Sequence, residues 1–144
     1  MYCDYKAIYE TLYIISEDET WRDSVADYVK SCAKLNYYIT NYINKSDLPE
    51  EIFNKDDTIK ELTKNINNFG GYGRVYEIGQ GYFLKIKYIV KQKNKGITQS
   101  HKATLFDNYI LGTIKEYIRQ MEDDENTIKD RLDYAREVFT KDVT

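Results

Sequence analysis

The chain is poor in the residues from which metal sites and disulfide frameworks are built. Its 144 residues include one histidine, two cysteines and one proline. A metal site with paired imidazoles is therefore excluded, and Cys3 and Cys32 lack both the close spacing of zinc ligands and the numbers of a disulfide framework. Two reduced, packed thiols are what we expect of a protein of the cytosol.

Long hydrophobic runs are missing as well. No stretch of about 18 apolar residues occurs, and the N-terminus from Met1 to Tyr5 has neither the basic nor the apolar segment of a signal peptide. We therefore expect neither secretion nor a membrane partner, and predict a cytoplasmic protein. The length suits a single domain, 1–144, and is too short for a complete two-lobed enzyme.

The common catalytic motifs are also absent. The sequence has no Gly-x-Ser-x-Gly elbow, no His-Glu-x-x-His pair and no acidic calcium loop. Its acidic runs at 17–19, 50–51, 56–57 and 122–125 lie at predicted helix starts, where carboxylates stabilise the positive end of the helix dipole. His101 is expected on the surface. We accordingly predict no catalytic residue, no metal site and no cofactor.

The overall charge limits the partners. With 21 basic and 24 acidic residues the net charge is −3, which disfavours bulk binding to nucleic acid. The exception is the stretch 85–102, which contains lysines and no acid. These lysines are either the solvated face of a strand and a turn, or a nucleic-acid contact in which Tyr82 or Tyr88 stacks on bases.

Apolar residues recur at helical spacing through the first 69 residues. They predict a short helix from Tyr5 to Ile15, a long amphipathic helix from Trp21 to Ile43 and a further helix at 58–68. From Tyr72 the period changes to two, and the alternation at 82–91 predicts a hairpin with one apolar and one Lys-rich face.

The second half of the chain returns to helical spacing after this hairpin. Residues 97–106 are either a third strand or a loop that leads into a helix, and helices are predicted at 108–121 and 127–140. The order predicts an α+β fold with N-terminal helices (1–69), a small central antiparallel sheet (70–106) and C-terminal helices (107–144).

One segment carries a more specific pattern, made of Gly70, Gly71, Gly73, Val75 and Lys85. It resembles the glycine-rich loop and third-strand lysine of protein kinases, with the short spacing of the poxvirus kinases; in this family the loop amides and the lysine hold the ATP phosphates. The resemblance covers 68–87, with Asn68 in place of the first loop glycine, and the downstream kinase motifs are missing. It implies a nucleotide-binding module without phosphotransfer by this chain alone.

Tyrosine is unusually frequent, with 15 tyrosines against five phenylalanines. Tyr37, Tyr38 and Tyr42 lie so close together on the long helix that they cannot all face one core. Exposed tyrosine is typical of binding surfaces, so these three residues are predicted to form a face for a protein partner or for self-association. The alternative is that AT-rich coding places tyrosine in an ordinary core and at its boundary.

Together these features favour a small binding protein without catalysis. We expect it to be encoded by a phage, a virus or another mobile element and to inhibit a host protein or ribonucleoprotein complex, for example as an anti-CRISPR-type inhibitor. The contact residues predicted for the partner are Tyr37, Tyr38, Tyr42, Lys87, Lys91, Lys93 and Lys95. The two alternatives are the kinase-like nucleotide module and a nucleic-acid contact through the Lys-rich hairpin.

Overall fold

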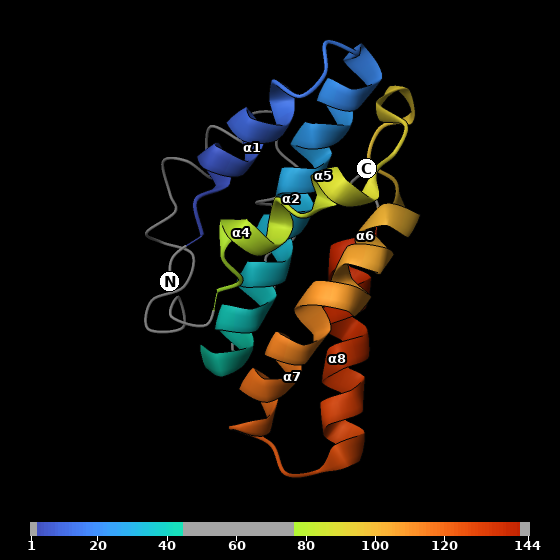
Figure 1. Ribbon diagram of the computed structural model, residues 1–144. Coiled ribbons are helices and arrows are strands. Elements are labelled where there is room, and N and C mark those ends of the chain that lie inside the picture. Colours follow the sequence, from blue (N-terminus) through green and yellow to red (C-terminus); the bar gives the residue numbers. More distant parts are fainter. Residues whose placement is uncertain (1–2, 45–76, 142–144) are drawn as a thin grey trace.

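The computed structural model describes residues 3–44 and 77–141, apart from the side chains of 40–44. All regular elements in these ranges are helical (Figure 1). They are α1 (Tyr5–Tyr13), α2 (Glu19–Asn44), α4 (Gln80–Phe83), α5 (Ile86–Ile89), the 3₁₀ turn η4 (Lys93–Lys95), α6 (Gln99–Leu105), the π-helical turn η5 (Phe106–Ile110), α7 (Leu111–Arg119) and α8 (Glu125–Thr140).

The predicted antiparallel sheet is wrong, because all regular elements in the described part of 70–106 are helical. The α+β class is therefore corrected to an all-α arrangement for these residues. The apolar residues of 82–91 fit both a period of two and a helical period, and the ones that are buried, Phe83, Ile86 and Val90, have helical spacing. A helical turn forms part of its hydrogen bonds within the segment, such as Leu84 N to Gln80 O at 2.9 Å, and the Tyr28 hydroxyl donates to the Phe83 carbonyl at 2.6 Å, whereas a strand requires a partner strand.

Four of the predicted helices are confirmed, as α1, α2, α7 and α8. Two of the four acidic runs, 17–19 and 122–125, lie at helix starts as expected, whereas 50–51 and 56–57 lie outside the described residues. Asp18 accepts a hydrogen bond from the Trp21 amide at 3.2 Å, and Asp124 accepts one from the Thr127 amide at 3.0 Å. The predicted helix at 58–68 lies outside the described residues.

The described helices form two groups. α1 packs on α2, while α6, η5 and α7 follow one another as a bent rod beside which α8 returns (Figure 1). α2 also contacts α8, and this contact joins the two groups. The short helices α4 and α5 cross between them, with α4 against α1 and α5 against α6.

Phe139 on α8 lies at the centre of the core. Its ring is 6.1 Å from Tyr28 on α2, 5.8 Å from Phe83 on α4 and 6.3 Å from Phe106 on η5, measured between ring centroids. These rings are fully buried. Aromatic contacts therefore connect the two helix groups through the crossing helix α4.

A buried amide attaches residue 78 to the long helix. The Asn36 side chain accepts a hydrogen bond from the Ile78 amide at 2.7 Å and donates one to the Ile78 carbonyl at 3.0 Å. It also donates to the Tyr5 hydroxyl at 3.1 Å, and the Glu77 carboxylate accepts from the Cys3 amide at 3.1 Å. This joint positions the chain at the start of α4.

Candidate functional site

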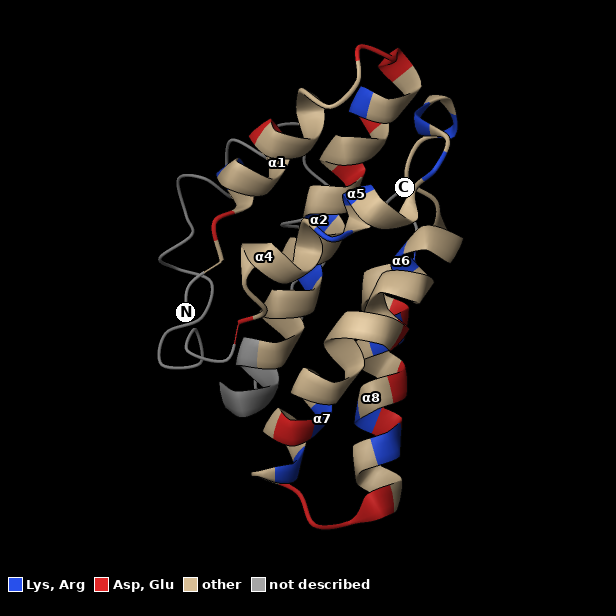
Figure 2. Cartoon of the chain, in the orientation of Figure 1, with Lys and Arg blue, Asp and Glu red and all other residues tan. Residues whose placement is uncertain are grey.

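Lysine and tyrosine side chains of α4, α5, η4 and the turns between them lie outside the core, in the stretch 78–106 that contains no acid, and Tyr109 of η5 lies beside Lys85. We call this set the lysine–tyrosine surface: Tyr82, Lys85, Lys87, Tyr88, Lys91, Lys93, Lys95 and Tyr109. Figure 2 shows the lysine positions along α5 and η4. Tyr88 is 65% exposed, and Tyr82 and Tyr109 are 40% and 42% exposed.

Local sequence explains why these groups face outward. α4 and α5 are each a single helical turn, and each turn buries one residue, Phe83 or Ile86, toward the core. Val90 follows as the next buried position. Because a single turn buries one side only, the lysines and tyrosines between the buried residues remain outside.

Two lysines of this surface lie over aromatic rings. The Lys87 ammonium is 5.1 Å from the centre of the Tyr88 ring, and the Lys85 ammonium is 5.1 Å from the centre of the Tyr109 ring. Both distances are within the range of cation–π attraction. The second contact brings the turn between α4 and α5 onto the π-helical turn η5, so that residues far apart in the sequence form one surface.

Lys93 has a structural role within this set. Its ammonium donates a hydrogen bond to the Val90 carbonyl at 2.7 Å and lies 5.1 Å from the centre of the Trp21 ring. Next to it, Gly96 has a φ of 72° and packs so closely on Ser24 that a Cβ atom would lie 2.9 Å from the Ser24 hydroxyl. Lys93 and Gly96 together hold η4 on the first turns of α2, whereas Lys91 and Lys95 are exposed.

The three tyrosines of the predicted α2 face are not equivalent. Tyr38 is 7% exposed, its ring packs edge-on against Tyr134 of α8 at 4.9 Å, and its hydroxyl donates to the Arg131 carbonyl at 3.4 Å. Tyr37 is half-buried against the core. The side chain of Tyr42 lies outside the described residues. Tyr38 therefore links α2 to α8, and this burial leaves little of its ring for a partner.

The kinase-like pattern falls only partly on described residues. Gly70, Gly71 and Gly73 lie outside them. Lys85 lies in the helical turn between α4 and α5, where its ammonium contacts the Tyr109 ring, and not on a strand as the resemblance implies. The nucleotide-binding module remains a prediction from the sequence.

The potential catalytic groups are engaged in the fold. His101 caps α6: its Nδ1 accepts a hydrogen bond from the Thr98 amide at 3.0 Å, and its own amide donates to the Thr98 hydroxyl at 3.3 Å. Cys32 is fully buried, and desolvation raises the pKa of its thiol well above the usual value. Within 3–44 and 77–141, no group of three or more metal-ligating side chains occurs.

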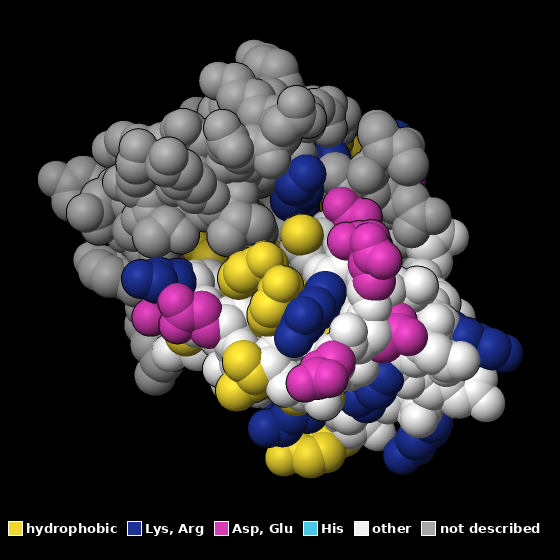
Figure 3. All heavy atoms as spheres, turned by 90° about the horizontal axis from the view of Figure 1, so that it is seen from above, with side chains coloured by type: hydrophobic (Ala, Val, Ile, Leu, Met, Phe, Trp, Pro, Cys, Tyr) yellow, Lys and Arg dark blue, Asp and Glu magenta, His cyan; other side chains and the backbone are white. Residues whose placement is uncertain are grey.

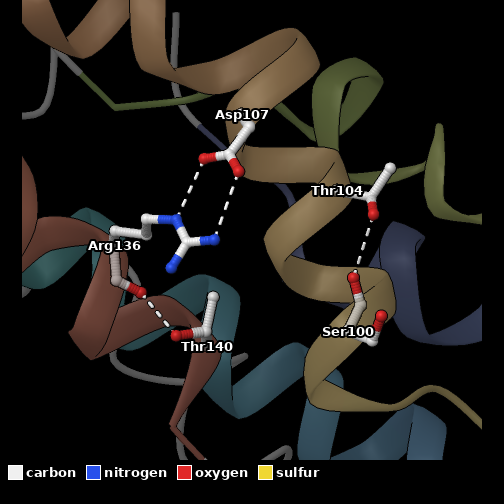
Figure 4. A network of polar contacts seen from close by, with 5 residues as sticks. All are labelled: Ser100, Thr104, Asp107, Arg136 and Thr140. Atoms are coloured by element: carbon white, nitrogen blue, oxygen red, sulfur yellow. Dashed lines mark hydrogen bonds and ion pairs between the residues drawn. The ribbon is translucent and has the colours of Figure 1, made fainter.

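A shallow hollow of about 440 Å³ lies between α6 and the last turn of α8. Arg136, in its wall, donates two hydrogen bonds to Asp107 of η5, from Nε at 3.0 Å and from Nη2 at 3.2 Å (Figure 4). Thr140 donates to the Arg136 carbonyl, and Thr104 donates to the Ser100 carbonyl. These polar groups thus bond to one another. Neither periodicity nor any motif in the sequence indicates this pairing.

Comparisons with protein-family models, with curated proteins and with solved structures find no match for this chain. No described helix combines the length and the hydropathy that a membrane span requires. The lysine–tyrosine surface is therefore our candidate site on its geometry alone.

Proposed function

We propose that this protein is a binding protein without catalysis of its own, and that its lysine–tyrosine surface contacts an acidic face of a macromolecular partner. The observation that carries the proposal is the combination of exposed lysines and exposed tyrosines on an acid-free stretch, 78–106. Positive charge accelerates the encounter with an acidic partner, and tyrosine rings supply contact area at low entropic cost.

The arrangement of the lysines supports a preorganised contact. Lys87 over the Tyr88 ring and Lys85 over the Tyr109 ring hold ammonium groups beside exposed aromatic surface. Side chains that are already placed lose less conformational entropy on binding than freely rotating ones. The surface therefore suits a partner that presents carboxylates around an apolar contact.

The negative charge of the chain outside 78–106 favours a protein partner over a nucleic acid. The net charge of the chain is −3, so its acids outnumber its bases away from this stretch and repel an extended polyanion. Tyr88 still favours nucleic acid as the second candidate, because its exposed ring can stack on a base.

In biological terms we propose an inhibitor of a host protein or ribonucleoprotein complex, of the anti-CRISPR type. It would act in the cytosol of the host and be encoded by a phage, a virus or another mobile element. The small size, the lack of catalytic motifs and the AT-rich-type composition, with its 15 tyrosines, support this role.

The test compares two triple variants of equal charge change. Lys87→Ala/Lys91→Ala/Lys95→Ala removes three lysines from the proposed surface, and Lys6→Ala/Lys115→Ala/Lys129→Ala removes three from α1, α7 and α8. Binding to fluorescent poly-L-glutamate and to a single-stranded oligonucleotide is measured by anisotropy at low and at physiological salt.

We expect the surface triple to weaken poly-L-glutamate binding at least tenfold and the control triple to leave it within twofold. Equal weakening by both triples would refute the surface. Tighter binding of the oligonucleotide, together with its loss in Tyr88→Ala, would establish the nucleic-acid function instead.

A further inference from the structure

The hollow between α6 and the end of α8 has a polar lining that contains charges of both signs. Its volume of about 440 Å³ is in the range of sites that bind small molecules. Arg136, Glu137 and Lys141 line it on the side of α8, and Gln99 and Ser100 line it on the side of α6. Among the described residues that line it, none has an aromatic ring, so we expect it to hold neither a stacked nucleobase nor a lipid chain.

The two walls of this hollow are held in place by contacts outside the space itself. The Arg136–Asp107 pair joins α8 to η5 (Figure 4). The buried Lys102 ammonium of α6 donates to the Lys141 carbonyl at 3.3 Å and to the Ser31 hydroxyl of α2 at 3.1 Å. The hollow is therefore formed before any ligand arrives, and a preformed site loses less entropy on binding.

One nitrogen of the Arg136 guanidinium is left for a ligand. Asp107 accepts hydrogen bonds from Nε and Nη2, whereas Nη1 has no partner in the part of the chain that the structure describes. Figure 4 shows this third nitrogen pointing away from Asp107. It can donate a charge-assisted hydrogen bond to a carboxylate while Asp107 holds the guanidinium in position.

Glu137 and Lys141 are oppositely charged and four residues apart, but they do not pair. Two other pairs at this spacing form ion pairs, namely Lys6–Glu10 at 3.8 Å and Lys129–Asp133 at 4.0 Å. On the face seen from above, acidic side chains likewise lie beside basic ones (Figure 3). Within 3–44 and 77–141, Glu137 and Lys141 take part in no ion pair, so the hollow contains one open charge of each sign.

The charges around the hollow balance one another. Arg136 and Lys141 are positive, whereas Glu137 and the neighbouring Asp107 are negative. A polyanion or a polycation therefore meets repulsion as well as attraction there. A molecule with one ammonium and one carboxylate, by contrast, can pair with both open charges at the same time.

We propose that this hollow binds a small zwitterion of the amino-acid class. The ammonium group of the ligand pairs with Glu137, and its carboxylate pairs with Lys141 and accepts a hydrogen bond from Nη1 of Arg136. Gln99 and Ser100, on the opposite wall, offer an amide and a hydroxyl to the rest of the ligand, so a polar side chain is favoured over an apolar one.

The test titrates the chain with L-glutamine and follows the amide chemical shifts by NMR. We expect the amides of Gln99, Ala103 and Thr140 to shift, with a dissociation constant in the millimolar range because the hollow is open to water. N-acetyl-L-glutamine lacks the ammonium group and L-glutaminamide lacks the carboxylate, so each should bind at least tenfold more weakly than L-glutamine.

Two substitutions assign the charges of the ligand to the two side chains. Glu137→Gln should weaken L-glutamine binding at least fivefold and leave N-acetyl-L-glutamine within twofold, because that compound has no ammonium group to lose. Lys141→Met should weaken L-glutamine at least fivefold and leave L-glutaminamide within twofold. The matched controls on α7, Glu116→Gln and Lys115→Met, should leave all three compounds within twofold. The melting temperature verifies that each variant is folded.

Three results would overturn the proposal. They are unchanged amide shifts around the hollow at tens of millimolar L-glutamine, equal binding of L-glutamine and N-acetyl-L-glutamine, which would indicate a site for simple anions, and equal effects of Glu137→Gln and Glu116→Gln. The residues that line the hollow are not part of the lysine–tyrosine surface, and no lysine of that surface is changed in this test. Either proposal can therefore fail while the other stands.

Discussion

Asn36 and Arg136 each connect segments that are distant in the sequence, but they do so in opposite surroundings. Asn36 is 1% exposed and bonds both backbone groups of Ile78. Arg136 forms a two-pronged ion pair with Asp107, and both side chains are nearly half exposed, at 45% and 47%. The hydrogen-bond lengths are similar, so the difference between the two joints lies in their access to water.

This difference decides what each joint contributes to stability. When a buried hydrogen-bond partner is removed, no water replaces it at the opposite polar group. The full desolvation penalty of that group is then lost from the free energy of unfolding. An exposed ion pair competes with hydrated charges and is screened by salt. The neutral amide therefore contributes more to the fold than the ion pair, although the latter carries full charges.

The largest effect is expected for Asn36→Ala. The variant leaves the buried Ile78 amide and carbonyl without their partner, so we expect the free energy of unfolding to fall by about 3 kcal/mol. Urea unfolding followed by circular dichroism measures the change. Asn94→Ala, an exposed asparagine in η4, is the matched control and should stay within about 0.5 kcal/mol. An equal loss in both variants would contradict the assigned role of the joint.

A smaller effect is expected at the Asp107–Arg136 pair. In a double-mutant cycle with Asp107→Ala and Arg136→Ala, the coupling energy should be about 0.5 kcal/mol, because both side chains are well exposed. Raising the salt concentration to about 0.5 M should reduce the coupling further, since ions screen exposed charges. A coupling above 2 kcal/mol that is insensitive to salt would mean that solvent does not reach this pair.

The smallest effect is expected from the protonation of His101. Its side chain is half-buried, so its access to water lies between that of the buried Asn36 and that of the exposed Arg136. Burial, and next the charge of Lys93, hold the pKa of His101 below its usual value of about 6.5. The unfolded chain therefore takes up the proton first, so this contribution to stability is complete above about pH 6.5 and is lost as the pH falls through the folded pKa.

His101→Gln isolates this contribution, because glutamine at the third helical position can still complete the capping box. We expect the free energy of unfolding of the natural chain to fall by a few tenths of a kcal/mol relative to the variant between about pH 6.5 and pH 5. Parallel urea titrations at several pH values measure the difference. A constant difference across this range would show that His101 does not titrate with folding.

Sequence periodicity predicts α2 and α8 because each has many turns with a consistent apolar stripe. It fails at 82–91, where seven apolar residues in a short stretch fit two periods and the choice depends on whether a partner strand exists. Lys93–Lys95 forms a single 3₁₀ turn that ends at Gly96, a residue type that is frequent in turns.

Part of the candidate site could likewise be predicted from the sequence, and part could not. Lysine content and the lack of acids indicate the charged stretch directly. Tyr38 and Tyr109 show the limit of this reasoning: Tyr38 is buried because Tyr134 of α8 covers it, and Tyr109 joins the surface because η5 lies beneath Lys85. Both contacts depend on helices that meet only after folding.

By itself, the sequence determined the long helices, whose apolar stripe repeats over many turns. It also determined the helix caps, which are hydrogen bonds between residues three apart, and the position of the acid-free lysine stretch. Tertiary structure alone decided that 80–105 forms short helices instead of strands, and which tyrosines are exposed. The physical reason is the distance along the sequence over which each effect acts. Helix propensity and capping involve residues close in sequence, whereas burial depends on which distant segment packs against a side chain and excludes water.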